Sequence, residues 1–293
     1  MAKKTIQLNG CTVGEESPVY MIAEIGLNHN GDIQIAKKLM DAAFSTNWNC
    51  VKFQKRTPEL CVPEHQKNVM RDTPWGKISY LEYRYKVEFE KEQYDYIDKY
   101  CKKKPIAWTA SIWDLKSAEF LMGYDVPFIK IPSAKLTEHE YIVEVSKSGK
   151  PVILSTGMST LEEIDAAVNV LEKHAKGGYA LMHTNSAYPA PLEDLNLRLI
   201  PFLKKRYNCI IGYSGHEYDL EPTVIAVSLG ASLVERHVTL NHGMWGSDHF
   251  ASLEVHGMDL LLKRIKNIEV ILGDGVKRLS EKEIEVRKKL RGY

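Results

Sequence analysis

The chain has 293 residues, of which 44% are hydrophobic and 26% charged, a composition typical of a globular protein with a large core. Its net charge of +1 argues against a nucleic-acid-binding protein, which would favour a strongly basic face. No apolar run approaches the roughly 18 residues that span a bilayer, and the start, MAKKTIQLNG, has no apolar signal core. Five cysteines without paired spacing argue against a disulfide or zinc framework. We therefore expect a cytoplasmic protein that interacts with neither membranes nor nucleic acids.

Residues 1–19 precede the first long apolar run, and their turn signal Asn9-Gly10 predicts a β-hairpin that caps one end of a larger domain. Beyond them, short apolar runs alternate with amphipathic segments. Eight runs predict buried strands: Tyr20–Leu27, Cys50–Phe53, Ile106–Ala110, Phe128–Pro132, Val152–Ser155, Tyr179–His183, Ile210–Tyr213 and Leu233–His237.

Helical periodicity and capping residues predict a helix after each strand. The expected helices cover about 32–46, 88–103, 114–122, 137–148, 160–174, 192–205, 221–229 and 258–272, and a last charged helix covers Glu281–Leu290. A long insertion, Lys55–Val87, interrupts the alternation, and a loop of this length is usually functional or structured on its own.

Eight strands that alternate with helices are typical of a (β/α)8 barrel. An open doubly wound sheet would show the same alternation, but the chain has no GxGxxG or GxxxxGK[ST] motif. We therefore expect one (β/α)8 barrel domain over residues 1–293, with a hairpin extension at 1–19 and a C-terminal helix at 276–293.

Polar side chains gather at the ends of the predicted strands, where barrel enzymes build their active sites. Four charged residues lie within or beside apolar runs, where an unpaired charge is costly: Glu24, Lys52, Lys130 and Glu235. One such residue would more often belong to a structural ion pair, but four at the same ends favour a site. Two lysines among hydroxyl and amide donors suit a small, doubly charged anion such as a phosphate ester.

His216 and His237 follow neighbouring predicted strands, so their imidazoles can converge on one point. Two imidazoles with a free position suit a divalent metal that acts as a Lewis acid. A single histidine at a strand end is more often a hydrogen-bonding residue than a ligand, so the prediction depends on the pair.

Eight stretches resemble motifs of the N-acetylneuraminate (sialic acid) synthase family: AEIGLNHNGD, VKFQ, KIPSA, PVILSTGMST, NSAYPAP, GYSGH, ERHVTL and GSDHFASLE. Their order is the same, and the resemblance covers about residues 18–290. It implies a (β/α)8 barrel that condenses phosphoenolpyruvate with an aldose, such as an N-acetylmannosamine-like sugar, to give a 3-deoxy-nonulosonic acid and phosphate. That reaction belongs to the biosynthesis of surface polysaccharides.

The resemblance also implies roles for single residues. Catalysis would involve Glu24, Lys52, His216 and His237, with a divalent metal, Mn²⁺ or Mg²⁺, on His216 and His237. Phosphoenolpyruvate would be held by Lys52, Thr109, Lys130, Ser133, Ser155, Asn185 and Ser214. The sugar would be contacted by Gln54, Lys135, Tyr188 and Asp248.

Three departures from the family pattern concern the sugar more than phosphoenolpyruvate. Gly215 and Lys135 stand where Asp and Glu are usual, and the small antifreeze-like domain that usually follows is not expected here. Lys135 suggests an anionic or non-acetylated acceptor, unless it points to solvent or pairs with Glu138. The insertion could replace the missing domain as a lid, and we expect a homo-oligomer.

Two other functions stay open at this point. A related enzyme could make a different 3-deoxy-ulosonate from another aldose or an aldose phosphate. A non-catalytic barrel could instead bind a sugar or regulate a partner.

Overall fold

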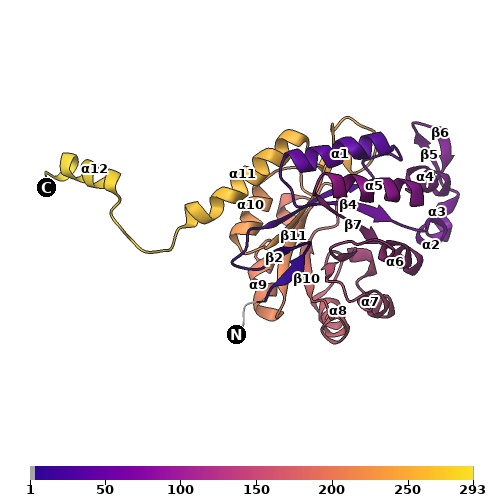
Figure 1. The fold of residues 1–293 in the computed structure, drawn as a ribbon, viewed down its shortest axis with the longest axis horizontal. Helices are drawn as coiled ribbons and strands as arrows, with labels where there is room; N and C mark the ends of the chain where they lie inside the picture. Colours follow the sequence, from indigo (N-terminus) through magenta and orange to yellow (C-terminus); the bar gives the residue numbers. More distant parts are fainter. Residues whose placement is uncertain (1–3, 293) are drawn as a thin grey trace.

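In the computed structural model, which describes residues 4–292, eight parallel strands form a closed barrel surrounded by helices (Figure 1). The barrel strands are β3 (Tyr20–Gly26), β4 (Cys50–Lys55), β7 (Ala107–Ile112), β8 (Ile129–Ile131), β9 (Val152–Ser155), β10 (Tyr179–Thr184), β11 (Ile210–Gly215) and β12 (Leu233–His237). Each pairs with its neighbours in chain order, and β12 closes the ring onto β3. The predicted barrel is confirmed over the open sheet.

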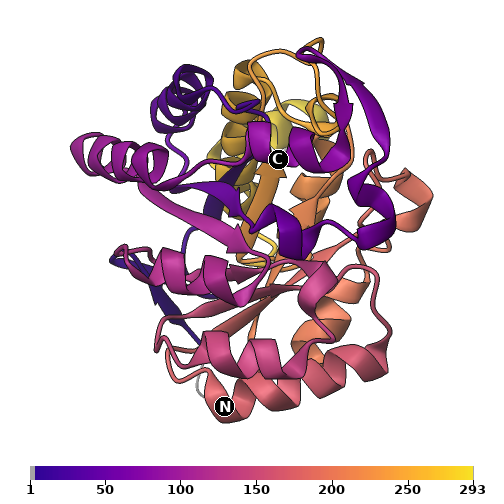
Figure 2. The ribbon, with the colours of Figure 1, turned by 90° about the vertical axis from the view of Figure 1, so that its right-hand side faces the viewer.

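Helices follow the strands and cover the outside of the barrel (Figure 2). They are α1 (Ile33–Ser45), α5 (Lys91–Lys103), α6 (Leu115–Met122), α7 (His139–Ser146), α8 (Leu161–His174), α9 (Leu199–Arg206), α10 (Glu221–Ser228) and α11 (Val255–Leu272). Side-chain caps define several starts: Asp32 accepts from the amide of Gln34, and Thr160 forms a capping box with Glu163. These capping residues are visible in the sequence, which explains why the predicted helix starts lie close to the observed ones.

One predicted helix is divided in the structure. The segment expected as a single helix over 192–205 begins with a short 3-10 turn, Leu192–Asp194, and α9 starts only at Leu199. Asn196 lies between them with a φ of 42°, a left-handed conformation that interrupts a right-handed helix. The periodic apolar pattern continued across this break and concealed it.

The lower half of the barrel interior is apolar. Side chains from seven of the barrel strands fill it, including Ile22 and Leu233, together with Phe128 just before β8. The N-terminal hairpin of β1 (Ile6–Leu8) and β2 (Cys11–Val13) adds Leu8 and Val13 from below. The predicted hairpin is therefore confirmed. The hairpin covers this end of the barrel, opposite the carboxyl ends of the strands.

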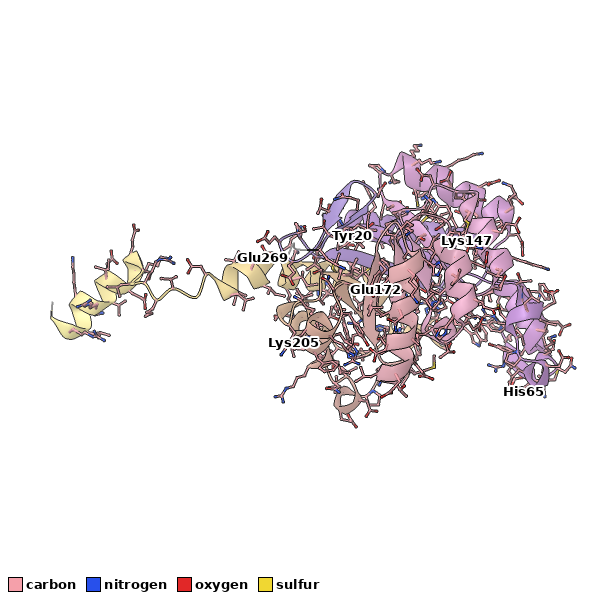
Figure 3. The ribbon with its side chains drawn as sticks, turned by 90° about the horizontal axis from the view of Figure 1, so that it is seen from below. Tyr20, His65, Lys147, Glu172, Lys205 and Glu269 are labelled. Carbon is pink, nitrogen blue, oxygen red and sulfur yellow. The ribbon has the colours of Figure 1, made fainter. Side chains whose placement is uncertain are left out.

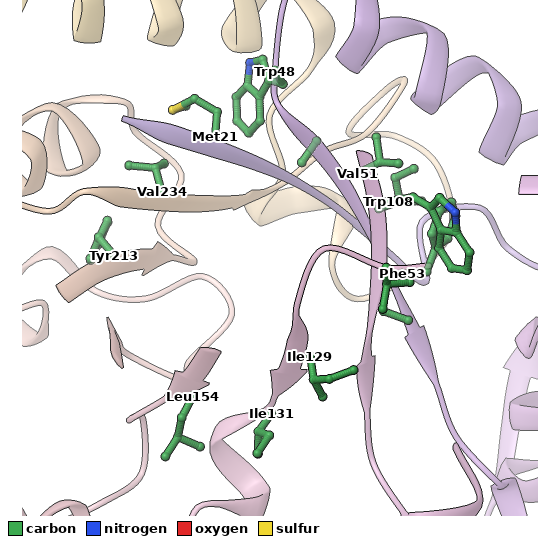
Figure 4. Close-up of a cluster of buried hydrophobic side chains, with 14 of the residues drawn as sticks. Met21, Trp48, Val51, Phe53, Trp108, Ile129, Ile131, Leu154, Tyr213 and Val234 are labelled. Carbon is green, nitrogen blue, oxygen red and sulfur yellow. The ribbon is translucent and has the colours of Figure 1, made fainter. Parts of the chain in front are cut away.

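Alternate strand residues point outward and form a second core under the helices. Figure 4 shows part of it, with Met21, Val51, Phe53 and Ile129 on strands and Trp48 before β4. Burying one such side chain contributes roughly 1.5–3 kcal/mol. The strands are thus fixed on both faces, which makes their carboxyl ends a rigid platform.

The insertion after β4 has a structure of its own: α2 (Pro58–Cys61), α3 (Glu64–Lys67), the hairpin of β5 (Met70–Thr73) and β6 (Gly76–Ser79), and α4 (Tyr80–Val87). Ser79 and Glu82 form a capping box that starts α4. The insertion lies at the end of the molecule opposite α12 (Glu281–Arg291). Figure 3 shows His65 at the insertion end, and Glu269 on α11 where that helix leaves the barrel toward α12. No helix within residues 4–292 is long and apolar enough to cross a membrane.

Candidate active site

A cavity opens at the carboxyl ends of the strands, above the apolar interior. Most of the residues predicted for the site line it: Glu24, Lys52, Gln54, Lys130, Ser133, Ser155, Tyr188, Ser214, His216 and His237. They come from β3, β4, β8, β9, β11 and β12 and from the turns that follow β8, β10 and β11. The closure of the barrel therefore gathers residues that are up to 213 positions apart, Glu24 and His237, side by side in paired strands.

A buried lysine lies between two carboxylates on one side of the cavity. Lys52 Nζ is 2.7 Å from Glu24 Oε2 and 3.5 Å from Glu235 Oε1, and it donates to Ser111 Oγ at 2.7 Å. Burial by itself would lower the pKa of Lys52, but Glu235 and Glu24 together raise it, so the ammonium is charged. Burial would also raise the pKa of Glu235, whereas Lys130 and Lys52 lower it to about 2.

Lys130 is a second buried ammonium, and it has no carboxylate within ion-pair distance in the described chain. Its Nζ donates to Ser155 Oγ at 2.6 Å and to the carbonyl of Ile131 at 3.3 Å. Burial lowers the pKa of Lys130 to about 8, and Lys52 adds to this effect. An incoming anion would stabilise the charged form, so Lys130 is suited to bind a phosphate or carboxylate.

Hydroxyl groups surround these two lysines. Ser133 Oγ accepts from the amide of Gly157, and Ser214 Oγ donates to Glu235 Oε1 at 3.1 Å. Ser111 and Ser186 also line the cavity, although the family pattern did not single them out. The hydroxyls can reorient toward an anion, because each both donates and accepts.

Two residues predicted to hold phosphoenolpyruvate lie outside this cavity. The hydroxyl of Thr109 donates to the carbonyl of Phe128 at 2.8 Å, inside the barrel wall. Asn185 lines a neighbouring cavity near α8 and α9, and its side chain bonds the backbone of Ala187 and Asp194. Its carbonyl oxygen is instead 2.5 Å from His216 Nδ1.

The two predicted metal-binding histidines lie side by side at the ends of β11 and β12, where both line the cavity. Their ring centroids are 5.4 Å apart, and Tyr188 stacks on His216 at 4.0 Å with its hydroxyl 2.9 Å from Nε2. Burial lowers the pKa of His216 to about 3, and His237 contributes. His216 is therefore neutral. With Nδ1 donating to the carbonyl of Asn185, its Nε2 carries a lone pair that accepts from the Tyr188 hydroxyl and that could instead bind a metal.

The donor set fits a divalent ion that has few protein ligands. Nδ1 of His237 is buried and has no hydrogen-bond partner within residues 4–292, and Asp248 Oδ2 is 3.9 Å away. Among residues 4–292 no three His, Cys, Asp or Glu side chains are grouped tightly enough to hold an ion together. An ion on His216 and His237 would thus take its remaining ligands from substrate and water, as Mg²⁺ and Mn²⁺ readily do.

The sugar-side residues are less concentrated. Gln54 Nε2 donates to Glu24 Oε1 at 3.0 Å, and Gln54 Oε1 accepts from Arg56. Burial would raise the pKa of Asp248, but His237 and other nearby groups lower it, so this carboxylate is ionised. Lys135 lies apart, in another cavity between α6 and α7, where it pairs with Glu138 at 2.7 Å.

The insertion contacts the loop after β12 beside the cavity. Trp245 of that loop makes edge contacts with Tyr83 at 5.3 Å and Trp75 at 6.0 Å. At the base of the insertion, the guanidinium of Arg56 stacks over Trp113, which lines the cavity, at 3.7 Å. Sequence reasoning missed Arg56 and Trp113, because nothing in the pattern of a loop shows which of its side chains turn inward.

Comparisons with known proteins identify the family of the chain. Residues 39–277 match the model of the NeuB family. The chain is 39% identical to N-acetylneuraminate-9-phosphate synthase of Drosophila melanogaster over 86% of this chain and 68% of the relative, and 36% identical to N,N'-diacetyllegionaminic acid synthase of Campylobacter jejuni over 90% and 80%. A sialic acid synthetase of Leptospira borgpetersenii, solved with citrate, superposes with a TM-score of 0.86 at 30% identity, over 99% of this chain and 98% of that one. The chain therefore belongs to the NeuB family, whose members are phosphoenolpyruvate-dependent condensing enzymes that form carbon–carbon bonds.

Proposed function

We propose that this protein condenses phosphoenolpyruvate with an N-acetylmannosamine-like aldose to give a 3-deoxy-nonulosonic acid and phosphate. The observation that carries the proposal is the buried group of Lys52, Lys130, Glu24 and Glu235 above an apolar floor. Its two lysines can hold an anion, and its carboxylates lie beside them at the reacting end.

Phosphoenolpyruvate is held on the side of β8 and β9. Lys130, which has no carboxylate within ion-pair distance among residues 4–292, bonds the phosphate or carboxylate together with Ser133 and Ser155. Lys52 supports departure of the phosphate, since its ammonium can neutralise charge on the leaving oxygen.

The aldose meets the enol carbon on the histidine side. A divalent ion, when bound at His216 and His237, supplies Lewis-acid polarisation of the aldehyde oxygen. Tyr188 lines this side, Asp248 lies beside His237, and both would orient the sugar hydroxyls. The enol carbon of phosphoenolpyruvate attacks the aldehyde carbon, and positive charge develops at the carbon that bears the phosphate.

Glu24 acts at that carbon. Its carboxylate lies 2.7 Å from Lys52 Nζ and can stabilise the cation or remove a proton from the attacking water. Water adds to the carbon, the proton passes to Glu24, and phosphate leaves by C–O cleavage. The products are the ulosonic acid, which keeps the new carbon–carbon bond, and inorganic phosphate.

The test is release of phosphate from phosphoenolpyruvate by the purified protein with a panel of aldoses, with and without Mn²⁺. We expect release that requires both an aldose and the metal. Binding of sugar without any phosphate release, with every acceptor tested, would support the non-catalytic barrel instead.

An aldose phosphate is the second candidate acceptor, and two arginines favour it. Nε of Arg56 and Nη2 of Arg84 are buried and have no hydrogen-bond partner in the described chain, and Arg84 is 4% exposed. Burial lowers the pKa of Arg56 to about 10, and the nearby charge of Arg84 adds to this effect. An anionic group at the far end of the sugar would give both guanidinium groups a hydrogen-bond acceptor and a counter-charge. A lower KM for the 6-phosphate of an aldose than for the free aldose would identify it as the acceptor.

A further inference from the structure

The outer side of the β11–β12 pair, opposite the histidines, carries a buried ion pair. His216 and His237 point into the barrel, so their neighbours Glu217 and Arg236 lie on the outer side, under α10. Both are 0% exposed, and Arg236 Nη1 is 3.0 Å from Glu217 Oε1. Two fully buried charges next to both proposed metal ligands need an explanation.

The pair is bonded on almost every side. Glu217 accepts from Tyr213 Oη at 2.8 Å and from Thr223 Oγ1 at 3.1 Å. Arg236 donates to Thr223 Oγ1 at 2.9 Å, to the carbonyl of Asp219 at 3.0 Å and to the carbonyl of Glu217 itself. The arginine of β12 thereby holds the backbone that leaves β11.

Gly215 provides the space for this arrangement. A Cβ at this position would lie 2.6 Å and 2.7 Å from the carboxylate oxygens of Glu217 and 2.8 Å from the ring of Tyr213. Any side chain at 215 would therefore displace the carboxylate from Arg236. Gly215 is also paired directly with Arg236 in the β11–β12 register.

We propose that Glu217 and Arg236 are positioning residues that hold the backbone of His216 and His237 so that both imidazoles face one metal ion. The proposal rests on the metal site of the proposed function. Each member of the pair is adjacent in sequence to one histidine, so the ion pair ties the two ligands together through the backbone. His237 depends on this most, because no hydrogen-bond partner in the described part of the chain holds its Nδ1 and orients the ring.

The experiment measures Mn²⁺ affinity of the full-length protein without substrates, by the electron paramagnetic resonance signal of free Mn²⁺, together with the melting temperature. Glu217→Gln leaves Arg236 buried without a counter-charge. We expect it to weaken Mn²⁺ binding about 10- to 100-fold, as is typical when a group that orients a metal ligand is lost. Thr223→Val, a milder change, removes the bridging hydroxyl and should weaken binding less.

A matched control separates positioning from stability. Val145→Ala opens a cavity in α7, away from the histidines, where Val145 is 0% exposed. It should lower the melting temperature but leave the Mn²⁺ affinity within about twofold of the wild type. His216→Ala should abolish binding.

A transfer of the carboxylate provides a second test, because residue 215 lies directly opposite Arg236. Gly215→Asp alone places two carboxylates in one space and should weaken Mn²⁺ binding, whereas Gly215→Asp/Glu217→Ala moves the carboxylate and should recover most of the affinity. Such non-additivity is expected only for residues that act as one unit.

Wild-type Mn²⁺ affinity in Glu217→Gln and Thr223→Val, at melting temperatures as low as that of Val145→Ala, would overturn the proposal and leave the metal site intact. Wild-type protein that binds Mn²⁺ no better than His216→Ala would overturn the metal site itself, and this proposal with it.

Discussion

The two sides of the cavity are built differently. On the phosphoenolpyruvate side, Lys52, Lys130 and Ser155 lie on strands that are fixed by cores on both faces. On the acceptor side, Tyr188, Asp248 and Arg56 lie on turns and on the start of the insertion. Strands fix the chemistry shared by the family, whereas loops can change without disturbing it, so the second side is where acceptor choice can vary.

The largest effect is expected for a substitution of Glu24, which lies between the two sides of the cavity. Glu24→Gln should lower kcat about 10²- to 10⁴-fold while phosphoenolpyruvate binds within a few-fold of the wild type, since the amide keeps a contact with Lys52 but cannot accept a proton. Phosphate release measures the change in kcat, and calorimetry measures the binding of phosphoenolpyruvate. Glu90→Gln, exposed on the surface, is the control. Unchanged phosphate release by Glu24→Gln would remove Glu24 from the mechanism.

The phosphoenolpyruvate side can be probed alone with Lys130→Met. Loss of a buried cation that binds the anion should raise KM for phosphoenolpyruvate about 10- to 100-fold, the equivalent of roughly 1.4–2.7 kcal/mol, with a smaller change in the acceptor KM. Steady-state kinetics with each substrate varied gives both constants. Equal changes in both would show that the cavity is not divided as described.

The pKa of Lys130 predicts a pH dependence for the same side. Free Lys130 is charged below its pKa of about 8 and neutral above it. Because the anion binds the charged form, KM for phosphoenolpyruvate should rise as pH increases through about 8. Lys130→Arg should shift this rise to higher pH, since a guanidinium remains charged there. A wild-type profile that is flat from pH 7 to 9.5 would argue against Lys130 as the anion-binding group.

The acceptor side should respond to Arg56→Gln with a change in acceptor KM of about 3- to 30-fold and an unchanged KM for phosphoenolpyruvate. An increase confined to phosphorylated aldoses would assign Arg56 to an anionic acceptor group. An equal change for neutral aldoses would mean that Arg56 acts through Gln54, which it contacts.

The smallest effect is expected for Lys135→Glu. Lys135 lies in another cavity and pairs with Glu138, and an exposed pair of this kind contributes little, about 0.2–1 kcal/mol. Its turnover across an aldose panel should match that of the wild type. A changed acceptor profile would bring Lys135 back to the sugar side.

The same division explains what the sequence could predict. Charged residues inside apolar strands, such as Glu24, Lys52 and Glu235, are visible because burial makes them costly, and strand alternation places them inside the barrel. Asn196, which divides a helix, and Arg56, which turns inward from a loop, leave no periodic signal. Lys135 was placed beside the sugar by its motif, but the 3-10 turn Ser133–Lys135 directs it elsewhere. Gly215 looked like an unexplained departure until Glu217 was seen to occupy its space.

The central claim is that one cavity joins phosphoenolpyruvate to an aldose with C–O cleavage. Phosphoenolpyruvate that carries ¹⁸O in the bridging position between carbon and phosphorus tests it most directly, with both products analysed by mass spectrometry. The account predicts aldose-dependent turnover in which all label leaves with the phosphate and the sugar acid gains an unlabelled three-carbon unit. Label retained in the sugar acid, or label released as phosphate without any aldose, would contradict it.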